Sequence, residues 1–257
     1  MKAKSIKGNS PQEIKAALEN AMSDGYTPTL AIIFISVKQD HKAICKLMDD
    51  AGIAVFGCTT NGEFIDEATE KGSIAILLLD INRSYFQIYF EEYPEKNYRE
   101  ITNRIAQKVK ERFSAPAFFI AGSNMETDAE ELLFGFEDVV GKEVNVYGCM
   151  AGDDFTFSDQ FVFTNEYSSS RGLVCLALDE EKIMIRGVAT CGWRAVGTLR
   201  TVTKSSGNHV YTVDDIPVLD LTTKYGGLEN VSPDNEGLLL EIAANFPLQL
   251  QREKGDP

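Results

Sequence analysis

A ten-residue segment occurs twice in this chain, and this repeat constrains the possible folds more than any other feature. Residues 55–64 (VFGCTTNGEF) align with residues 146–155 (VYGCMAGDDF), so that a glycine, a cysteine and the closing phenylalanine coincide. Before each copy come an apolar segment, an amphipathic segment that ends at glycine, and a short apolar segment. Two related units are therefore expected, over residues 30–90 and 117–189, with chance similarity of short segments as the alternative.

Apolar and amphipathic segments follow one another along both units. Helices are expected after the capping residues Ser10, Asp40, Asn97, Thr127 and Asp215, because apolar residues at helical spacing follow each of them. Strands are expected over residues 30–37, 53–56, 74–79, 85–90, 117–121, 144–147, 161–163, 173–178 and 183–189. Several of these strands are adjacent in sequence, which predicts an α+β (mixed α/β) fold with mixed sheets rather than a doubly wound parallel sheet.

Each unit is expected to place a glycine-containing turn, residues 57–63 and residues 148–154, at the carboxyl end of a strand, where ligands often bind. Small residues there let backbone N–H groups hold an anion such as a carboxylate, and the acidic side chains are suited to an ammonium group. The candidate ligand-binding residues of the turns are Gly57, Cys58, Thr59, Thr60, Gly62, Glu63, Gly148, Cys149, Gly152, Asp153 and Asp154. The alternative is that the glycines only form tight turns and the acids only cap backbone N–H groups.

Cys58 and Cys149 are the best candidates for a nucleophile, because a cysteine between a strand and a turn can be exposed and activated by nearby N–H groups. The chain has only 2 histidines, His41 and His209, and both are expected at the surface. The alternative is that both cysteines are small, half-buried structural residues.

Metal and nucleotide motifs are missing from the sequence. It contains no HExxH, no CxxC and no calcium-loop pattern. Residues 135–142 (GFEDVVGK) are similar to a P-loop, but they have one residue too many between the glycines and are expected to end a helix instead of opening one. No metal and no cofactor are therefore expected.

The charge and the cysteines limit the partners and the compartment. The formal net charge is −14, which disfavours binding to nucleic acid and to anionic membranes. Apolar runs are too short to span a bilayer, and residues 1–10 lack the apolar stretch of a secretory signal. The five cysteines are widely spread, which is typical of reduced thiols in a cytoplasmic protein.

The motifs resemble those of the FIST family. Residues 56–63 (FGCTTNGE) are similar to the G-C-[ST]-x-x-G-E turn of FIST N domains, and residues 148–154 (GCMAGDD) to their G-G-x-A-G-D-D segment. Residues 192–197 (GWRAVG) resemble their G-W-x-P-V-G segment. Two departures are Cys149, where the family more often has glycine, and Ala195, where it has proline.

This resemblance implies an intracellular sensory module that binds a small molecule such as an amino acid and acts on a signalling protein partner. It implies a FIST N-like domain over residues 1–228, and the beginning of a FIST C-like domain over residues 229–257 that is cut short. Trp193, the only tryptophan, is either a core anchor or a wall of the ligand pocket. No catalytic residue is implied, and the alternative function is a hydrolase or transferase that depends on Cys58.

Overall fold

The computed structural model of the chain describes residues 1–65, 68–156, 159–188, 194, 197–207, 209–226 and 247–249. The chain divides into two compact units, Met1–Val188 and Ala189–Pro257. The expected boundary between residues 228 and 229 lies outside the described residues, so that division and the shortened second domain stay predictions.

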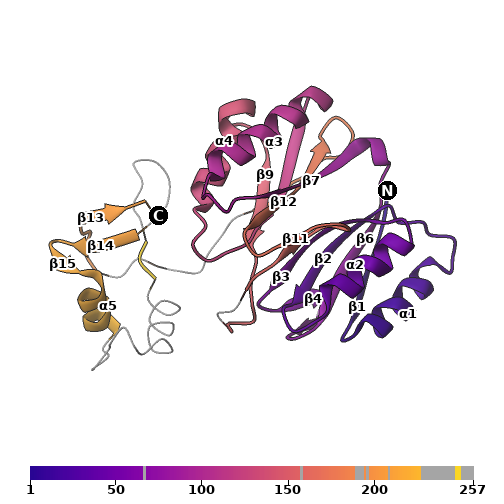
Figure 1. Cartoon of the computed structure of the whole chain (residues 1–257), viewed down its shortest axis with the longest axis horizontal. Coiled ribbons are helices and arrows are strands. Elements are labelled where there is room, and N and C mark those ends of the chain that lie inside the picture. The colour runs from indigo at the N-terminus through magenta and orange to yellow at the C-terminus, as the bar shows by residue number, and fades with distance from the viewer. Residues whose placement is uncertain are drawn as a thin grey trace. The chain divides into compact units, whose positions relative to one another are not determined.

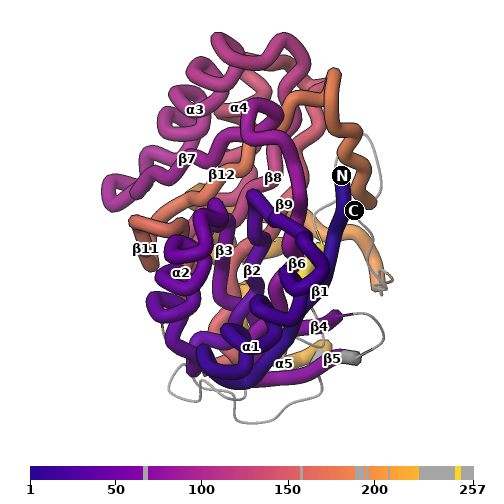
Figure 2. Tube along the Cα trace, turned by 90° about the vertical axis from the view of Figure 1, so that its right-hand side faces the viewer, coloured from indigo at the N-terminus to yellow at the C-terminus, as the bar shows by residue number. Residues whose placement is uncertain are grey.

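The first unit contains two large mixed sheets (Figure 1). The first sheet has the strand order β1-β6-β2-β3-β10-β11, in which only β2 and β3 are parallel. Figure 2 shows β2 between β3 and β6. The strands of this sheet are β1 (Lys2–Gly8), β2 (Leu30–Ser36), β3 (Ala54–Thr60), β6 (Ile74–Asp80), β10 (Val162–Phe163) and β11 (Ser168–Ser169). A small hairpin, β4 (Glu63–Ile65) and β5 (Ala68–Glu70), lies between β3 and β6 in the sequence.

The second sheet has the order β7-β12-β8-β9, in which only β8 and β9 are parallel. Its strands are β7 (Phe86–Glu92), β8 (Pro116–Gly122), β9 (Val146–Met150) and β12 (Gly172–Asp179). This order repeats the β1-β6-β2-β3 part of the first sheet, with helices at matching places in the sequence. The duplication stays a prediction. The repeated strand order favours it if each unit begins one strand and one helix before the expected starts at residues 30 and 117.

Helices cover one face of each sheet, and the other faces pack against one another. The helices are α1 (Pro11–Met22), α2 (His41–Asp50), α3 (Tyr98–Arg112) and α4 (Ala129–Val140), with the short 3-10 turn η1 (Arg83–Tyr85) before β7. One core cluster lies between α1, α2 and the first sheet, and a second between α3, α4 and the second sheet. A third cluster joins residues of both sheets, among them Phe56 and Phe119, whose ring centroids are 5.0 Å apart.

Side chains that alternate between the two faces of each strand explain these layers. In β2, Ile33 and Ile35 belong to the cluster under the helices, whereas Leu30 belongs to the cluster between the sheets. In β12, Cys175 lies on the helix side and Leu176 on the side of the other sheet. Because side chains alternate with a period of two, a strand that is buried on both faces is apolar throughout.

The α+β prediction is confirmed, and three element predictions are wrong. Residues 183–188 form no strand, although Ile183 and Ile185 pack against the cluster between the sheets. The N-cap of α4 is Asp128 rather than Thr127, and its carboxylate accepts bonds from two backbone N–H groups. The last helix, α5 (Val218–Gly226), begins later than expected, because Ile216 and Pro217 pair with β14.

The second unit, as far as it is described, is a small sheet with one helix. β13 (Val202–Ser206) and β14 (His209–Val213) form a hairpin, and β15 (Ile216–Pro217) pairs with β14. Residues 229–257, expected to begin a further domain, lie outside the described residues except for 247–249.

Candidate functional site

The segments that follow β3 and β9 contact one another directly. The backbone N–H of Gly152 donates to the carbonyl of Thr59 at 2.8 Å, and that of Asp154 donates to the carbonyl of Thr60 at 3.3 Å. The N–H of Asp153 donates to Asn61 Oδ1 at 2.8 Å. The two candidate segments, about ninety positions apart in the sequence, therefore form one junction, which we call the β3–β9 junction (residues 59–63 and 151–154).

The first candidate segment is mostly strand, and the expectation of a turn over residues 57–63 is wrong for its first half. Gly57, Cys58, Thr59 and Thr60 continue β3, because β2 pairs with them on one side and β10 pairs with Gly57 and Cys58 on the other. Only the short stretch at Asn61 and Gly62 turns the chain.

The second segment differs from the expected turn in the same way. Gly148 and Cys149 belong to β9, and the turn begins after Met150. Pairing with the neighbouring β8 extends β9 past Gly148. The local sequence does not predict this extension, because it depends on the partner strand.

Close packing explains why glycine is needed at three of the four candidate glycine positions. A Cβ at Gly57 would overlap the ring of Phe163, and one at Gly148 would overlap the carbonyl of Ile120. A Cβ at Gly152 would lie 2.6 Å from Asn61 Oδ1. These glycines allow β3, β9 and β10 and the junction to approach one another, which is a structural role.

The backbone N–H groups of the second segment are already occupied, and this is a correction. Ala151 N–H donates to Gly122, and the three following N–H groups donate to Thr59, Asn61 and Thr60 within the junction. Thr59 N–H donates to the carbonyl of Phe161 at 2.8 Å. The expected cradle of free N–H groups for a carboxylate is therefore absent at these described positions.

Glu63 is a buried carboxylate with a complete set of donors. It is 2% exposed, and Thr60 Oγ1 donates to its Oε1 at 2.6 Å. The backbone N–H and the hydroxyl of Ser73 both donate to its Oε2 at 3.0 Å. These bonds hold the end of β3 against the start of β6, so Glu63 fixes the shape of the junction.

Asp153 and Asp154 differ from Glu63, because each has a buried oxygen without a partner. Asp153 is 3% exposed, and no donor reaches its Oδ2. Asp154 accepts a bond from Ser36 Oγ at 2.5 Å through Oδ2, but no donor reaches its Oδ1. In the described part of the chain, no ion pair joins Lys or Arg to any of the three junction carboxylates.

The backbone around Asp154 is unusual. Asp154 and Phe155 have φ angles of 56° and 58°, in the left-handed region that residues with a side chain rarely adopt. Such conformations occur in ordinary turns, where Asp tolerates them well, and also at functional sites. Phe155 is 63% exposed, so burial of its ring does not hold this conformation.

The two candidate cysteines are also brought together. Cys58 is fully buried, whereas Cys149 is exposed, and the two thiols lie close enough to affect each other's ionisation. The pKa of Cys58 is raised by its interaction with Cys149 and by burial, and the same interaction lowers the pKa of Cys149. His41, which was expected at the surface, is half-buried and stacks on Phe161 and Phe163.

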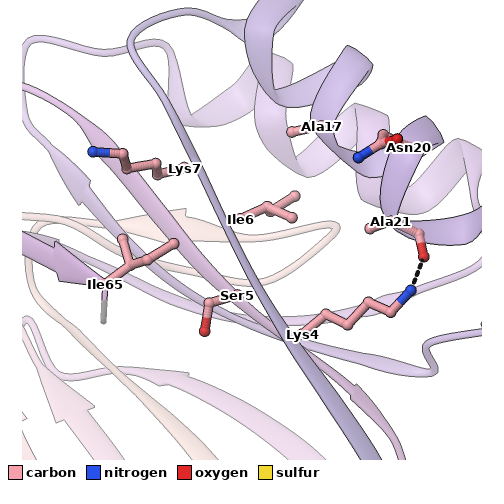
Figure 3. A pocket seen from close by; sticks show the side chains of 8 residues that line it. All are labelled: Lys4, Ser5, Ile6, Lys7, Ala17, Asn20, Ala21 and Ile65. Atoms are coloured by element: carbon pink, nitrogen blue, oxygen red, sulfur yellow. Dashed lines mark hydrogen bonds between the residues drawn. The ribbon is translucent and has the colours of Figure 1, made fainter. Parts of the chain in front are cut away.

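Two open hollows among the described residues lie away from the junction. One of about 520 Å³ lies between β1 and α1, where Lys4 Nζ donates to the carbonyl of Ala21 at 2.6 Å (Figure 3). Another lies beside β7 and the loop before β11 and is lined in part by Arg83 and Tyr167. Neither is lined by a candidate residue, and Trp193 lies outside the described residues. Among the described residues, no three His, Cys, Asp or Glu side chains group closely enough to hold a metal ion.

Three residues that form hydrogen bonds at the junction were not predicted. Ser36 and Ser73 provide the donors to Asp154 and Glu63, and Asn61 accepts the N–H of Asp153. Asn61 lies between the candidates Thr60 and Gly62 in the sequence and could have been included in the predicted site. The two serines lie at the end of β2 and just before β6, and nothing in the sequence brings those positions together.

Comparison with protein families identifies the domain. The model of the FIST N domain matches residues 29–216, which is most of the chain. This domain indicates a sensory, ligand-binding role in signal transduction. No curated protein matches the chain. In the described residues, no helix is long and apolar enough to cross a bilayer.

Proposed function

The chain belongs to the FIST family, and on that basis we propose that it is an intracellular sensor whose small-molecule ligand binds at the β3–β9 junction through an ammonium group. Amino acids and other amines are the ligand class that fits this proposal. A change at the junction on binding would then be passed to a signalling protein partner.

The observation that carries the proposal is the unpartnered Oδ2 of Asp153. A buried carboxylate oxygen without a donor costs free energy, commonly about 1–3 kcal/mol, unless something else fills its place. Asp154 Oδ1 lies in the adjacent residue and also lacks a donor. An ammonium group supplies three donors and a positive charge, which suits two acceptors on neighbouring residues.

The surrounding charge favours a cation over an anion. Three carboxylates lie in the junction without an ion pair to Lys or Arg among the described residues, and the chain as a whole carries a formal charge of −14. The occupied N–H groups of residues 151–154 leave no donors there for a carboxylate. An amino acid would therefore be held at the junction by its ammonium end.

A thermal-shift screen tests this proposal. Each amino acid or amine is compared with its N-acetyl form, which lacks the charge, because a ligand of the folded state raises the melting temperature. We expect the charged form alone to stabilise the protein. Calorimetry with the best compound should then show affinity reduced about tenfold or more in Asp153→Asn, the loss expected for one charge-assisted hydrogen bond.

Glu63→Gln is the matched control for this variant. Its carboxylate is fully bonded, so the amide should lower the free energy of unfolding by about 1–3 kcal/mol, because an NH₂ group would face the donors of Ser73 or Thr60. Asp153→Asn should leave that free energy nearly unchanged, as measured by urea denaturation. Equal ligand affinity in Asp153→Asn, Asp154→Asn and the parent would show that the ligand binds elsewhere.

The alternative of a hydrolase or transferase using Cys58 has no support in the geometry. Cys58 is 0% exposed, and its pKa is raised by its interaction with Cys149 and by burial. A nucleophile needs access to its substrate and a populated thiolate, and Cys58 has neither.

A further inference from the structure

Two cysteines from different sheets meet beside the β3–β9 junction. Cys58 belongs to the core cluster between the sheets, as does Ala121. Cys149 is the partner of Ala121 in the ladder of β8 and β9, so its side chain lies on the same face of that sheet. The backbone bond from Gly152 N–H to the carbonyl of Thr59 brings the two strand ends together, and the two thiols lie close enough to shift each other's pKa.

The two thiols have different access to solvent. Cys149 is exposed, since β9 is the last strand of its sheet and its neighbours Gly148 and Met150 are exposed as well. Cys58 is completely buried behind it. An oxidant arriving from solvent therefore reaches Cys149 first, and the nearest second thiol is Cys58.

The pKa shifts of the two thiols agree with this order. The interaction between them lowers the pKa of Cys149 and, together with burial, raises that of Cys58. A thiolate, not a thiol, attacks a disulfide or a peroxide. Cys149 is accordingly the attacking sulfur and Cys58 the resolving one.

We propose that Cys149 and Cys58 form a thiol-oxidation site that reacts with low-molecular-weight disulfides to give a disulfide between β9 and β3. The Cys149 thiolate attacks one sulfur of the reagent, its S–S bond breaks, and one thiolate leaves and takes up a proton. Cys58 then loses its proton and attacks Cys149 Sγ, which releases the second thiol. One reagent disulfide is reduced to two thiols as the two cysteines are oxidised, so atoms and electrons balance.

The proposed bond would connect the strands next to the site described above. Cys58 directly precedes Thr59, whose carbonyl accepts the N–H of Gly152, and Cys149 lies three residues before Gly152. A covalent link there would restrain both sides of the junction. This inference concerns a modification site and does not depend on which ligand the junction binds.

Incubation of the full chain with glutathione disulfide tests the inference. Trypsin cleaves after Lys and Arg and places each of the five cysteines in a separate peptide, so mass spectrometry after alkylation assigns every thiol. We expect a crosslink between the peptides of Cys58 and Cys149 as the main product. We also expect Cys149 to react about tenfold or more faster than the buried Cys45 and Cys175.

Single variants separate the roles of the two thiols. Cys58→Ala should stop at a mixed disulfide between glutathione and Cys149, and Cys149→Ala should leave Cys58 unmodified. Cys175→Ala is the matched control, because Cys175 is buried on the helix side of β12, and it should crosslink like the parent. The proposal is overturned if folded parent protein forms no Cys58–Cys149 crosslink, or if Cys149→Ala still oxidises at Cys58.

Discussion

At the scale of single residues, hydrogen bonds divide side chains that the sequence presents as equivalent. Glu63 and Asp154 align in the repeated segment, and both are acidic residues near the end of a strand. In the structure Glu63 accepts three hydrogen bonds, whereas Asp153 and Asp154 each keep a buried oxygen without a donor. Sequence presents these acids as equivalent candidates, and only the hydrogen bonds of the folded chain distinguish Glu63 from the two aspartates.

The aligned cysteines diverge in the same way, and this predicts different pH dependence. Because its pKa is lowered, Cys149 should be alkylated by iodoacetamide with a rate whose pH midpoint lies below that of an ordinary thiol. Cys58→Ala removes the interaction between the thiols and should raise that midpoint. Rates measured by peptide mass spectrometry between pH 6 and about 10 cover the range in which thiols ordinarily titrate.

Cys45 provides the comparison for this titration. Burial raises its pKa to about 12, so it should stay unreactive over the same range while the protein is folded. An unchanged midpoint in Cys58→Ala would mean that the interaction between the thiols does not control the reactivity of Cys149.

At the scale of elements, the close approach of β10 to β3 depends on Gly57. We expect Gly57→Ala to lower the free energy of unfolding by about 1–3 kcal/mol, because the methyl group would overlap the buried ring of Phe163. Gly62→Ala is the matched control. Its nearest neighbour would be the carbonyl of Glu70 at 3.6 Å, so its effect should stay within about 0.5 kcal/mol.

Urea denaturation of both variants measures this difference directly. A Gly57→Ala protein as stable as the parent would show that Phe163 can move without loss.

The sequence predicted elements well where apolar pattern and burial coincide. The expected strands at residues 30–37, 74–79, 117–121 and 173–178 correspond to β2, β6, β8 and β12, because most residues of all four strands are apolar and buried. β1 was missed, since four of its seven residues are exposed and three are lysines. Residues 183–188 alternate like a strand but only bury Ile183 and Ile185 against the core.

Contacts between distant segments set the limit of sequence reasoning for the site. The alignment of residues 55–64 with 146–155 predicted that the two segments are related, and the structure places them in contact. It did not reveal that hydrogen bonds within the junction occupy the N–H groups of residues 151–154, because those partners come from the other segment. Local sequence carries no information about such partners.

At the scale of the whole molecule, the three core clusters all lie within the first unit, Met1–Val188. The FIST N match has different limits, since it starts at residue 29 and omits both β1 and α1. β1 pairs with β6 along its whole length, and α1 buries Ile14 and Leu18 in the first cluster. Part of the structural unit therefore lies outside the region that the FIST N model matches.

This difference yields a prediction about fragments. A fragment of residues 1–188 should unfold cooperatively, because it keeps every member of the three clusters. A fragment of residues 29–216 should be much less stable. It loses Ile6, Ile14 and Leu18, worth about 1.5–3 kcal/mol each when buried, against a total stability of about 5–15 kcal/mol for a typical domain.

Thermal unfolding followed by circular dichroism compares the two fragments, with the full chain as the reference. The shorter N-terminus also leaves β6 as an unpaired edge strand, so the 29–216 fragment should associate more readily in size-exclusion chromatography. If it melts as high and as cooperatively as the 1–188 fragment, then β1 and α1 are accessory. In that case the region that the FIST N model matches, rather than the two-sheet unit, is what folds.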